Sequence, residues 1–279
     1  MRFALVGDVH GVWGDPDVEQ IDRLGYAAVL VTGDLPGRLH RDTLAVARAI
    51  ARLRTPVYAI AGNHDGTAPL QVAAEALDTF RDLPWHQRLQ RLRVAELDEA
   101  LRPHVLGGYS LHTLSDGDLS VDLLVARPHA MGGAHLTFRA WLRERYGVAS
   151  MEESAERLKA LVDEARHPIV VLCHNGPRGL GVGGPWGLSR QDRDLGDLDL
   201  AEAVAHAHAT GKRVLAVCGG HVHHGRDRAW RVERDGVLYV NAARVPRVFR
   251  YEGRTVRHHV RLHLDARGAV AEELLLPDD

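Results

Sequence analysis

The amino-acid sequence predicts an α/β protein, and three observations support this prediction. Short runs typical of β-strands alternate with helical stretches over the first 61 residues. The alternation resumes at residue 168, and β-type runs follow it to the end of the sequence. With 279 residues, 45% of them apolar and 26% charged, the chain has the composition of a soluble globular protein that buries a substantial core.

The first 61 residues show the clearest alternation. Strands are predicted over residues 2–6, 27–31 and 57–61, and helices over residues 18–24 and 43–53. In the second of these helices Leu44, Ala47 and Ile50 recur at helical spacing, and Arg48 lies between them on a face that solvent can reach.

Residues 70–167 carry mixed signals, and we interpret them as an insertion or cap in the α/β core. Helical patterns are predicted over 71–80, 140–145 and 152–165, and strand-like runs over 105–109 and 121–126. The core resumes with a strand over 168–172, a helix over 198–209 and a strand over 214–218.

The C-terminal part, residues 226–279, is predicted to be β-rich. Its runs have the length and the branched or aromatic content of antiparallel strands, at 229–232, 237–241, 256–264 and 270–275. Neither a fixed-period repeat nor a low-complexity tract is visible in the chain. We therefore expect a single domain over residues 1–279.

Charge and cysteine content argue against several classes of protein. Thirty-five basic and 37 acidic side chains give a formal net charge of −2, which favours neither nucleic acid nor a membrane surface as partner. No apolar stretch approaches the roughly 18 residues of a membrane span, and the N-terminus lacks the layout of a secretory signal. Cys173 and Cys218 lie far apart in apolar runs, as buried thiols do. We expect a cytoplasmic protein.

Chemically active side chains gather at the ends of the predicted strands. Five polar clusters follow apolar runs, at residues 7–10, 33–34, 62–65, 174–175 and 220–223. In open α/β sheets the ligand site forms outside the carboxyl ends of the strands, so the five clusters are expected to meet in one crevice. A glycine is the first residue of four of the clusters and is expected to remove side-chain bulk where the backbone turns near a ligand.

Spacing within the clusters indicates a metal site. Extended residues two positions apart point to the same side, so Asp8 pairs with His10, and His221 with His223. Asn63 and His64 are adjacent, so their side chains should point apart, one toward a metal and the other toward a substrate.

The donor types suit divalent Mn, Fe or Zn, because they are carboxylate, amide and imidazole groups without thiolate. Seven candidates are too many for one zinc ion but enough for two ions that share a carboxylate. They are Asp8, His10, Asp34, Asn63, His174, His221 and His223.

In chain order the clusters read D-x-H, G-D, G-N-H-D, a lone H and G-H-x-H, and this pattern resembles the calcineurin-like metallophosphoesterases. The resemblance covers residues 2–65 and 168–223. It implies a four-layer α/β/β/α sandwich of two facing mixed sheets flanked by helices. It also implies ligand sets for two ions, with His64 facing the substrate: Asp8, His10 and His223 for one ion, Asn63, His174 and His221 for the other, and Asp34 as the bridge.

The function that the resemblance implies is hydrolysis of phosphomonoesters or phosphodiesters by a hydroxide that two divalent ions activate. The ions are expected to be Mn²⁺, with Fe or Zn as alternatives. His64 would protonate the leaving group as general acid. A small molecule or nucleotide is the expected substrate, because no basic stripe with interleaved aromatic residues favours nucleic acid. The alternative is a catalytically silent scaffold of this fold that binds a protein partner, although the retained ligands and His64 argue for activity.

The sequence departs from the family's protein phosphatases after the G-D motif. Those enzymes continue with a second Asp that orients the catalytic His and an Arg that binds phosphate. Here Gly37 takes the place of that Asp, so another group, such as a main-chain carbonyl, must orient His64. Arg38 matches the Arg and is a candidate for phosphate binding. The glycine-rich loop after the lone His offers Arg178 and Trp186 as candidates for substrate contact, and a plain surface linker is an equally good interpretation.

The remaining polar candidates receive more ordinary interpretations. Arg127 is interpreted as a strand end, with a substrate-facing role as the alternative. For His224 two interpretations are equally good: it supports the candidate ligands from behind, or it is simply exposed to solvent. The following histidines are interpreted as solvated or hydrogen-bonded: His112, His129, His135, His258, His259 and His263.

Overall fold

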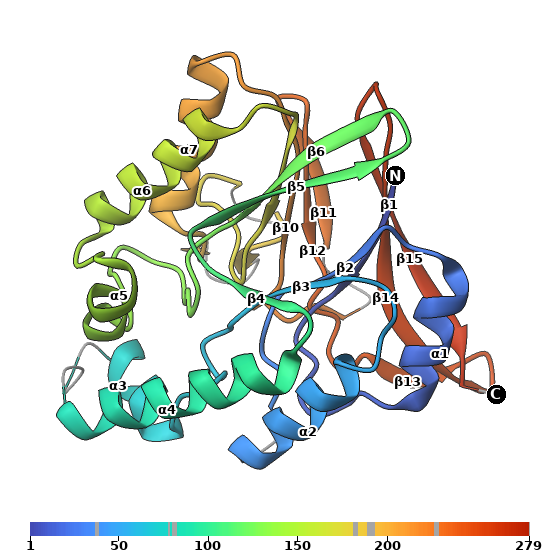
Figure 1. The fold of residues 1–279 in the computed structure, drawn as a ribbon, viewed down its shortest axis with the longest axis horizontal. Helices are drawn as coiled ribbons and strands as arrows, with labels where there is room; N and C mark the ends of the chain where they lie inside the picture. Colours follow the sequence, from blue (N-terminus) through green and yellow to red (C-terminus); the bar gives the residue numbers. More distant parts are fainter. Residues whose placement is uncertain are drawn as a thin grey trace.

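Two mixed β-sheets face each other, and helices cover their outer faces (Figure 1), in the computed structural model of the protein. The structure describes residues 1–36, 39–77, 79, 83–180, 184–188, 193–225 and 229–278. The architecture is the predicted four-layer α/β/β/α sandwich, so this prediction is confirmed.

The first sheet joins strands from the N-terminal part to strands from the C-terminal part. They are β1 (Arg2–Val6), β2 (Ala28–Val31), β3 (Val57–Ile60), β4 (Val105–Gly107), β13 (Val248–Tyr251), β14 (Arg254–Leu264) and β15 (Ala269–Pro277). The order is β13-β14-β1-β2-β3-β4, and β15 pairs with β14. The strands from β1 to β4 are parallel, and β14 is antiparallel to β1. The chain's two end regions therefore share one sheet.

The second sheet is parallel at its centre and antiparallel at its edges. Its strands are β5 (Ser110–Asp116), β6 (Leu119–Val125), β7 (Ile169–Leu172), β10 (Val214–Gly219), β11 (Arg231–Arg234) and β12 (Val237–Asn241). The order is β11-β12-β10-β7-β6-β5, with β12, β10, β7 and β6 parallel to their neighbours in that central run. A separate small sheet pairs β8 (Gly187–Leu188) with β9 (Arg193–Asp194).

The helices divide between the two outer faces (Figure 1). The sheet of β1 packs against α1 (Asp15–Leu24), α2 (His40–Ile50) and α4 (Pro84–Leu101). The sheet of β10 packs against α5 (Arg139–Tyr146), α6 (Met151–Glu164) and α7 (Leu198–Ala209), and α3 (Pro69–Ala76) lies beside α4 in the figure. Within the described residues, none of these helices has the length and apolar character needed to cross a membrane.

The alternation of side chains in β1 explains why the sheet is buried on both faces. Phe3 and Leu5 belong to the core between the two sheets, together with Leu123 of β6. Ala4 and Val6 belong to the core under the helices. Because successive strand residues point to opposite faces, a continuous apolar run is the pattern that a doubly covered parallel strand requires.

The segment 70–167 is built partly into the two sheets. It supplies β4 to the first sheet and β5 and β6 to the second, and its remaining elements are α3 to α6. Two of its elements have no predicted counterpart. The buried face of α4 carries His86 and Gln90 before Leu97 and Leu101, so its apolar stripe is interrupted. β5 is an edge strand whose side chains are all at least partly exposed, so it lacks the alternation of a half-buried strand.

The C-terminal part is made of strands, with one difference from the expected antiparallel arrangement. β12 pairs antiparallel with β11 but parallel with β10. Because β11 runs opposite to β10, the next strand of the hairpin returns parallel to β10. The unpredicted strand β13 is short and has no buried residue, so it leaves no hydrophobic signal in the sequence.

Candidate metal centre

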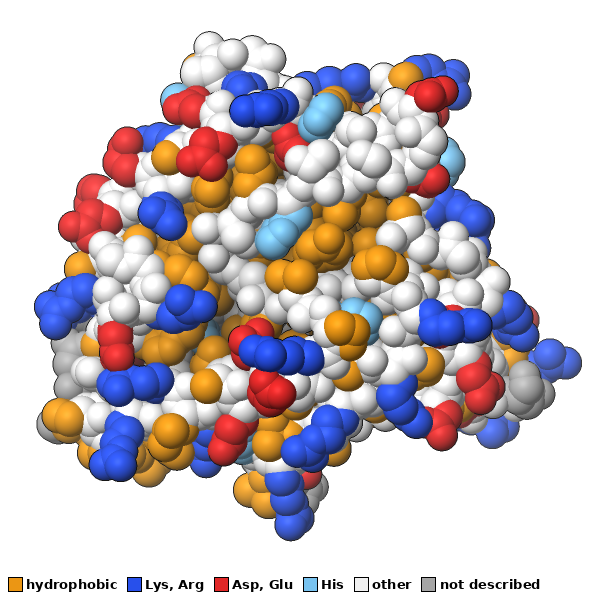
Figure 2. All heavy atoms as spheres, viewed as in Figure 1, with side chains coloured by type: hydrophobic (Ala, Val, Ile, Leu, Met, Phe, Trp, Pro, Cys, Tyr) orange, Lys and Arg blue, Asp and Glu red, His pale blue; other side chains and the backbone are white. Residues whose placement is uncertain are grey.

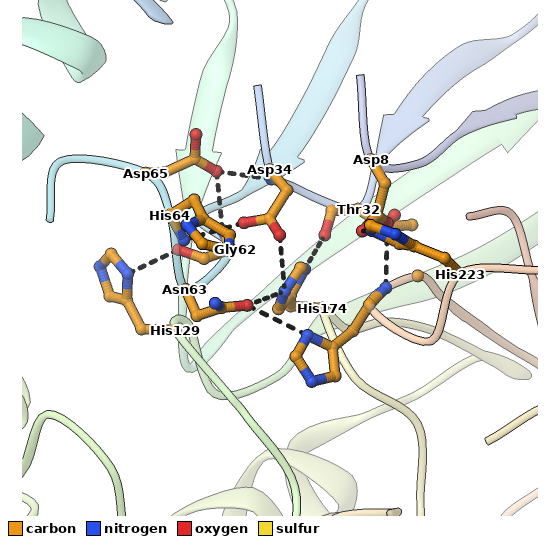
Figure 3. A network of polar contacts seen from close by, with 12 residues as sticks. Asp8, Thr32, Asp34, Gly62, Asn63, His64, Asp65, His129, His174 and His223 are labelled. Carbon is orange, nitrogen blue, oxygen red and sulfur yellow. Dashed lines mark hydrogen bonds and ion pairs between the residues drawn. The ribbon is translucent and has the colours of Figure 1, made fainter. Parts of the chain in front are cut away.

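The predicted ligands lie beyond the carboxyl ends of parallel strands (Figure 3). The ligands and the strands that they follow are Asp8 and His10 (β1), Asp34 (β2), Asn63 (β3), His174 (β7), and His221 and His223 (β10). Three of these strands belong to one sheet and two to the other. The crevice predicted from the sequence therefore lies where the ends of the two facing sheets meet.

One group of candidate ligands consists of Asp8, His10 and His223. One potential ligand atom from each lies within 4.8 Å of the others. The Nε2 atoms of His10 and His223 are 3.0 Å apart, and Nε2 of His223 is 3.1 Å from Oδ1 of Asp8. Asp8 is buried, whereas the two histidines are partly or largely open to solvent. The group thus places three donor atoms close together, with its histidines accessible to solvent.

A second group consists of Asp34, His174 and His221, again with potential ligand atoms within 4.8 Å of one another. The Asn63 side chain joins this group, because its Oδ1 atom lies 2.9 Å from Nε2 of His174 and 3.0 Å from Nδ1 of His221. Oδ2 of Asp34 is 3.7 Å from Nε2 of His174. All seven predicted ligands are therefore brought into two adjoining groups.

The two groups are linked by the backbone. The amide of His221, in the second group, donates to Oδ2 of Asp8 in the first, at 2.9 Å. Nδ1 of His174 donates to the carbonyl oxygen of Thr32 at 2.7 Å, which leaves Nε2 of that ring as the unprotonated donor atom toward Asn63 and Asp34. Holding the far nitrogen of an imidazole by a carbonyl is how proteins orient metal-binding histidines.

The carboxylates favour positive charge at this place. Burial alone would lower the pKa of His174, but the charges of Asp34 and Asp8 outweigh burial and raise it. Burial would raise the pKa of Asp8, but its hydrogen bond with His223 and the charges of the nearby histidines lower it. Buried carboxylate oxygens next to imidazole nitrogens are a donor set that divalent cations fit.

Several candidate ligands have a strained backbone conformation. The φ angles of Asp8, His10, Asp34 and His221 are +48°, +45°, +53° and +69°. Non-glycine residues rarely adopt such angles, and when they do they cluster at functional sites. The glycine expectation holds at Gly62, where an added Cβ would collide with the Asp34 carboxylate.

His64 lies beside the first group and is exposed. Its backbone amide donates to Oδ1 of Asp34 at 2.9 Å, and the centroid of its ring is 6.3 Å from that of His10. Among the described residues its imidazole has no hydrogen-bond partner, so the expected carbonyl that would orient it is not found there. Gly37 and Arg38, which the sequence analysis placed in this region, lie outside the described residues.

Asp65 organises the site, although sequence reasoning assigned it no role. Its buried carboxylate accepts hydrogen bonds from the backbone amides of Asp34 (2.8 Å), Leu35 (3.0 Å) and Gly62 (2.8 Å). Burial and the charge of Asp34 raise its pKa to about 7. The residue therefore ties the turn after β2 to the turn after β3, and its place in the G-N-H-D motif was the available signal.

His129 supports the same turn from the other sheet. Its buried Nδ1 atom donates to the carbonyl oxygen of Gly62 at 2.7 Å (Figure 3), and its ring packs edge-on against Trp141 at 4.6 Å between centroids. Burial lowers its pKa to about 4. The interpretation of this histidine as hydrogen-bonded agrees with the structure, but its hydrogen bond to Gly62, the residue before Asn63, was not foreseen.

The alternatives left open for two other residues are resolved by burial. His224 is buried and donates from Nε2 to the carbonyl oxygen of Asn241 at 3.1 Å, so it supports the ligand loop after β10 and is not simply exposed. Trp186 is buried too, and its Nε1 donates to the carbonyl oxygen of Gly220 at 2.9 Å. Trp186 therefore packs behind the ligands, which removes it as a candidate for substrate contact.

Arg178 is exposed, and in the described part of the chain its guanidinium group makes no hydrogen bond or ion pair with either group of candidate ligands. Its backbone amide donates to the carbonyl oxygen of Asp197 at 3.0 Å, which fixes the start of the glycine-rich loop.

Arg127 is neither substrate-facing nor a simple strand end, because its side chain is buried between two acids. Its guanidinium group donates to Asp199 at 2.7 Å and to Asp197 at 2.6 Å. The backbone amide of Asp197 in turn donates to the carbonyl oxygen of Gly176 at 2.8 Å. The Arg127–Asp197 ion pair therefore anchors the loop that follows His174.

Replacing Arg127 by Met is expected to lower the free energy of unfolding by about 3 to 5 kcal/mol, because two buried carboxylates would lose their cation. Urea unfolding of the purified protein measures this loss. The matched control is Arg157→Met on the exposed face of α6, where a change within about 0.5 kcal/mol is expected. Equal stability of the two variants would contradict the anchoring role.

The fold and the two ligand groups define an α/β sandwich protein with a candidate centre for two metal ions at its strand ends. The family model for calcineurin-like phosphoesterases matches residues 1–225, and the chain belongs to this family. The family typically binds two divalent metal ions, and it includes catalytically inactive members. No curated protein matches the chain.

Several solved structures are similar to this chain. The protein TT1561 of Thermus thermophilus shares 13% identity, and the match covers 97% of each chain with a TM-score of 0.52. The sulfate thiohydrolase SoxB of Thermus thermophilus shares 18% identity with a TM-score of 0.49, over 94% of this chain and 40% of its own. A metallophosphoesterase from Sphaerobacter thermophilus shares 15% identity with a TM-score of 0.36, over 98% of this chain and 88% of its own. At these identities the TT1561 match shows the fold alone.

Proposed function

We propose that the protein is a metal-dependent phosphoesterase that hydrolyses small-molecule or nucleotide phosphomonoesters or phosphodiesters. The observation that carries the proposal is the convergence of seven oxygen and nitrogen donors in two adjoining groups, with His64 exposed beside them. These residues come from two facing sheets. Their convergence therefore does not follow from local secondary structure, and a shared role in binding metal accounts for it. Membership in the calcineurin-like phosphoesterases supports the same class of reaction.

The ligands would be shared between two cations. Asp8, His10 and His223 would hold one ion, and Asn63, His174 and His221 the other, with Asp34 between them. Two divalent ions bound there would activate a water molecule and offset the charge of the phosphoryl group. We propose Mn²⁺ for both positions, with Fe or Zn as alternatives, because the donors are oxygen and imidazole nitrogen only.

His64 would deliver the proton to the departing oxygen. Its exposed imidazole can reach a bound ester, and its backbone amide is fixed on Asp34, so the ring stays next to the ligands. The carboxylates of Asp8 and Asp34 cannot take this role, because they are buried and engaged by backbone amides. An exposed imidazole beside a charged site is the usual general acid near neutral pH.

The remaining assignments extend the proposal. Arg38 and Arg178 are proposed to bind the substrate phosphate. We propose a single domain over residues 1–279, with an insertion or cap at about residues 70–167 and a β-rich C-terminal part at about residues 226–279. Cytoplasmic location is proposed because both cysteines are buried free thiols, the form that a reducing compartment maintains.

On the face drawn in Figure 2, acidic and basic side chains are interspersed, which does not favour nucleic acid, a polyanion, as a partner.

The rival proposal is a silent scaffold that binds a protein partner. Hydrolysis of p-nitrophenyl phosphate and bis-p-nitrophenyl phosphate by protein loaded with Mn²⁺, Fe²⁺, Zn²⁺ or Mg²⁺ decides between the two. We expect turnover of at least one ester with Mn²⁺, and its loss when EDTA removes the metal. Inert protein with all four metals and both esters would favour the scaffold.

A further inference from the structure

A groove of about 270 Å³ opens beside the candidate metal centre, with His10 and His64 in one wall. Its other walls come from the start of α2, from the turn before α3, and from α4. In the proposed function the general acid stands next to the leaving group, so this groove lies on the side from which the leaving group departs. What lines it therefore bears on which alcohols can be released.

Arg93 of α4 supplies a cation to the groove. Its Nη1 atom donates to the carbonyl oxygen of Thr67 at 3.0 Å, which fixes the side chain across the turn before α3. Within the described part of the chain the guanidinium group has no carboxylate partner and no further hydrogen-bond acceptor. Four of its five N–H groups therefore remain for a ligand.

The N-terminus of α2 faces the same groove. His40 is the first residue of this 11-residue helix, and the backbone amides of His40 and Arg41 have no acceptor among the described residues. The helix dipole favours an anion at such an end. Asp42 does not fill this place, because its carboxylate caps the amide of Leu39 at 2.9 Å and lies against the Arg41 side chain.

Thr43 gives an independent sign that a ligand belongs here. It lines the groove and is only 1% exposed, and its hydroxyl group has no hydrogen-bond partner among the residues that the structure describes. A buried hydroxyl without a partner costs about 1 to 3 kcal/mol, and a bound anion would relieve that cost. The nearby acid Glu96 is already engaged, because it accepts from Nε2 of His40 at 2.9 Å. Because Nε2 of His40 carries the proton in this hydrogen bond, Nδ1 of the same ring is an acceptor. The His40 ring therefore lines the groove but does not attract an anion.

We propose that this groove selects phosphoesters whose leaving group carries a second anionic group, either a carboxylate or another phosphate. The second anion would lie between Arg93, the start of α2 and the hydroxyl of Thr43, while the reacting phosphate lies at the candidate metal centre. This inference rests on the proposed phosphoesterase function and narrows its substrate class.

The test compares three esters on Mn²⁺-loaded protein: 4-carboxyphenyl phosphate, its methyl ester, and 1,4-phenylene bisphosphate. We expect kcat/KM for each ester with an anionic tail to exceed that of the methyl ester by about tenfold or more, as for a hydrogen bond between charged groups. The carboxylate and phosphate arms show which second anion is preferred. In Arg93→Met and Thr43→Val the ratio of kcat/KM for an anionic ester to kcat/KM for the methyl ester should fall toward 1. In Arg93→Lys this ratio should fall less.

The matched control is Arg91→Met, because Arg91 lies two residues away on α4 but pairs with Glu144 at 2.9 Å outside this groove. The control should keep the parent's ratio. Equal kcat/KM for the methyl ester and both anionic esters in the parent would overturn the inference while leaving the proposed function intact. So would a ratio that survives Arg93→Met. Failure to hydrolyse any of the three, with p-nitrophenyl esters also inert, would instead count against the proposed function.

Discussion

Asp34→Asn is expected to lower kcat/KM for p-nitrophenyl phosphate at least about 10³-fold and to reduce the metal content of the protein. The carboxylate is buried, one oxygen accepts from the amide of His64, and the other lies 3.7 Å from Nε2 of His174. An amide of the same shape keeps the hydrogen bond but removes the charge proposed to be shared by two cations. A shared ligand contributes several kcal/mol to charge stabilisation, and each 1.36 kcal/mol is tenfold in rate.

Metal analysis by inductively coupled plasma mass spectrometry, together with steady-state kinetics, measures both parts of this prediction. Asp118→Asn is the matched control, because Asp118 lies exposed in the turn between β5 and β6. The control should keep two ions per chain and the parent's rate. An Asp34→Asn protein with full metal content and unchanged kinetics would show that this carboxylate is not a ligand.

His64→Ala is expected to lower kcat about 10²- to 10⁴-fold, the contribution of a well-placed general acid. Metal content should stay at the parent's level, because the His64 side chain belongs to neither group of candidate ligands. The loss should also depend on the leaving group. Phenyl phosphate, whose phenolate is a poor leaving group, should suffer more than p-nitrophenyl phosphate, whose leaving group needs little protonation.

The comparison of these two esters separates a general acid from a residue that merely shapes the site. His135→Ala, a change at an exposed histidine, serves as the control and should leave both rates unaltered. An equal loss on both esters would point to a role in binding or folding, and no loss on either would remove His64 from the mechanism.

The convergence of the candidate ligands could be predicted from the sequence because their spacing is local and their positions follow strand ends. Asp8 and His10 lie two residues apart after β1, and His221 and His223 repeat that spacing after β10. Parallel strands bring their carboxyl ends to one edge, so the order of motifs was enough to predict the crevice. The four-layer arrangement came from the family resemblance, since strand runs alone do not say how many sheets form.

The groups behind the ligands could not be predicted in the same way. His129 reaches the carbonyl oxygen of Gly62 from the other sheet, and Arg127 meets Asp197 across 70 residues of sequence. Such contacts depend on how the two sheets pack, which no local pattern records. α4 escaped prediction for a related reason, because Gln90 fills part of its buried face through a hydrogen bond to Gln71 rather than through apolar packing.

The most direct test of the central claim is a crystal structure of Mn²⁺-loaded protein with data collected at the manganese absorption edge. We expect two anomalous peaks within coordination distance of the predicted ligands, one at Asp8, His10 and His223 and the other at Asn63, His174 and His221. Asp34 should contact both. Peaks elsewhere on the protein, or an ordered structure with no peak at these residues, would contradict the proposed binuclear centre.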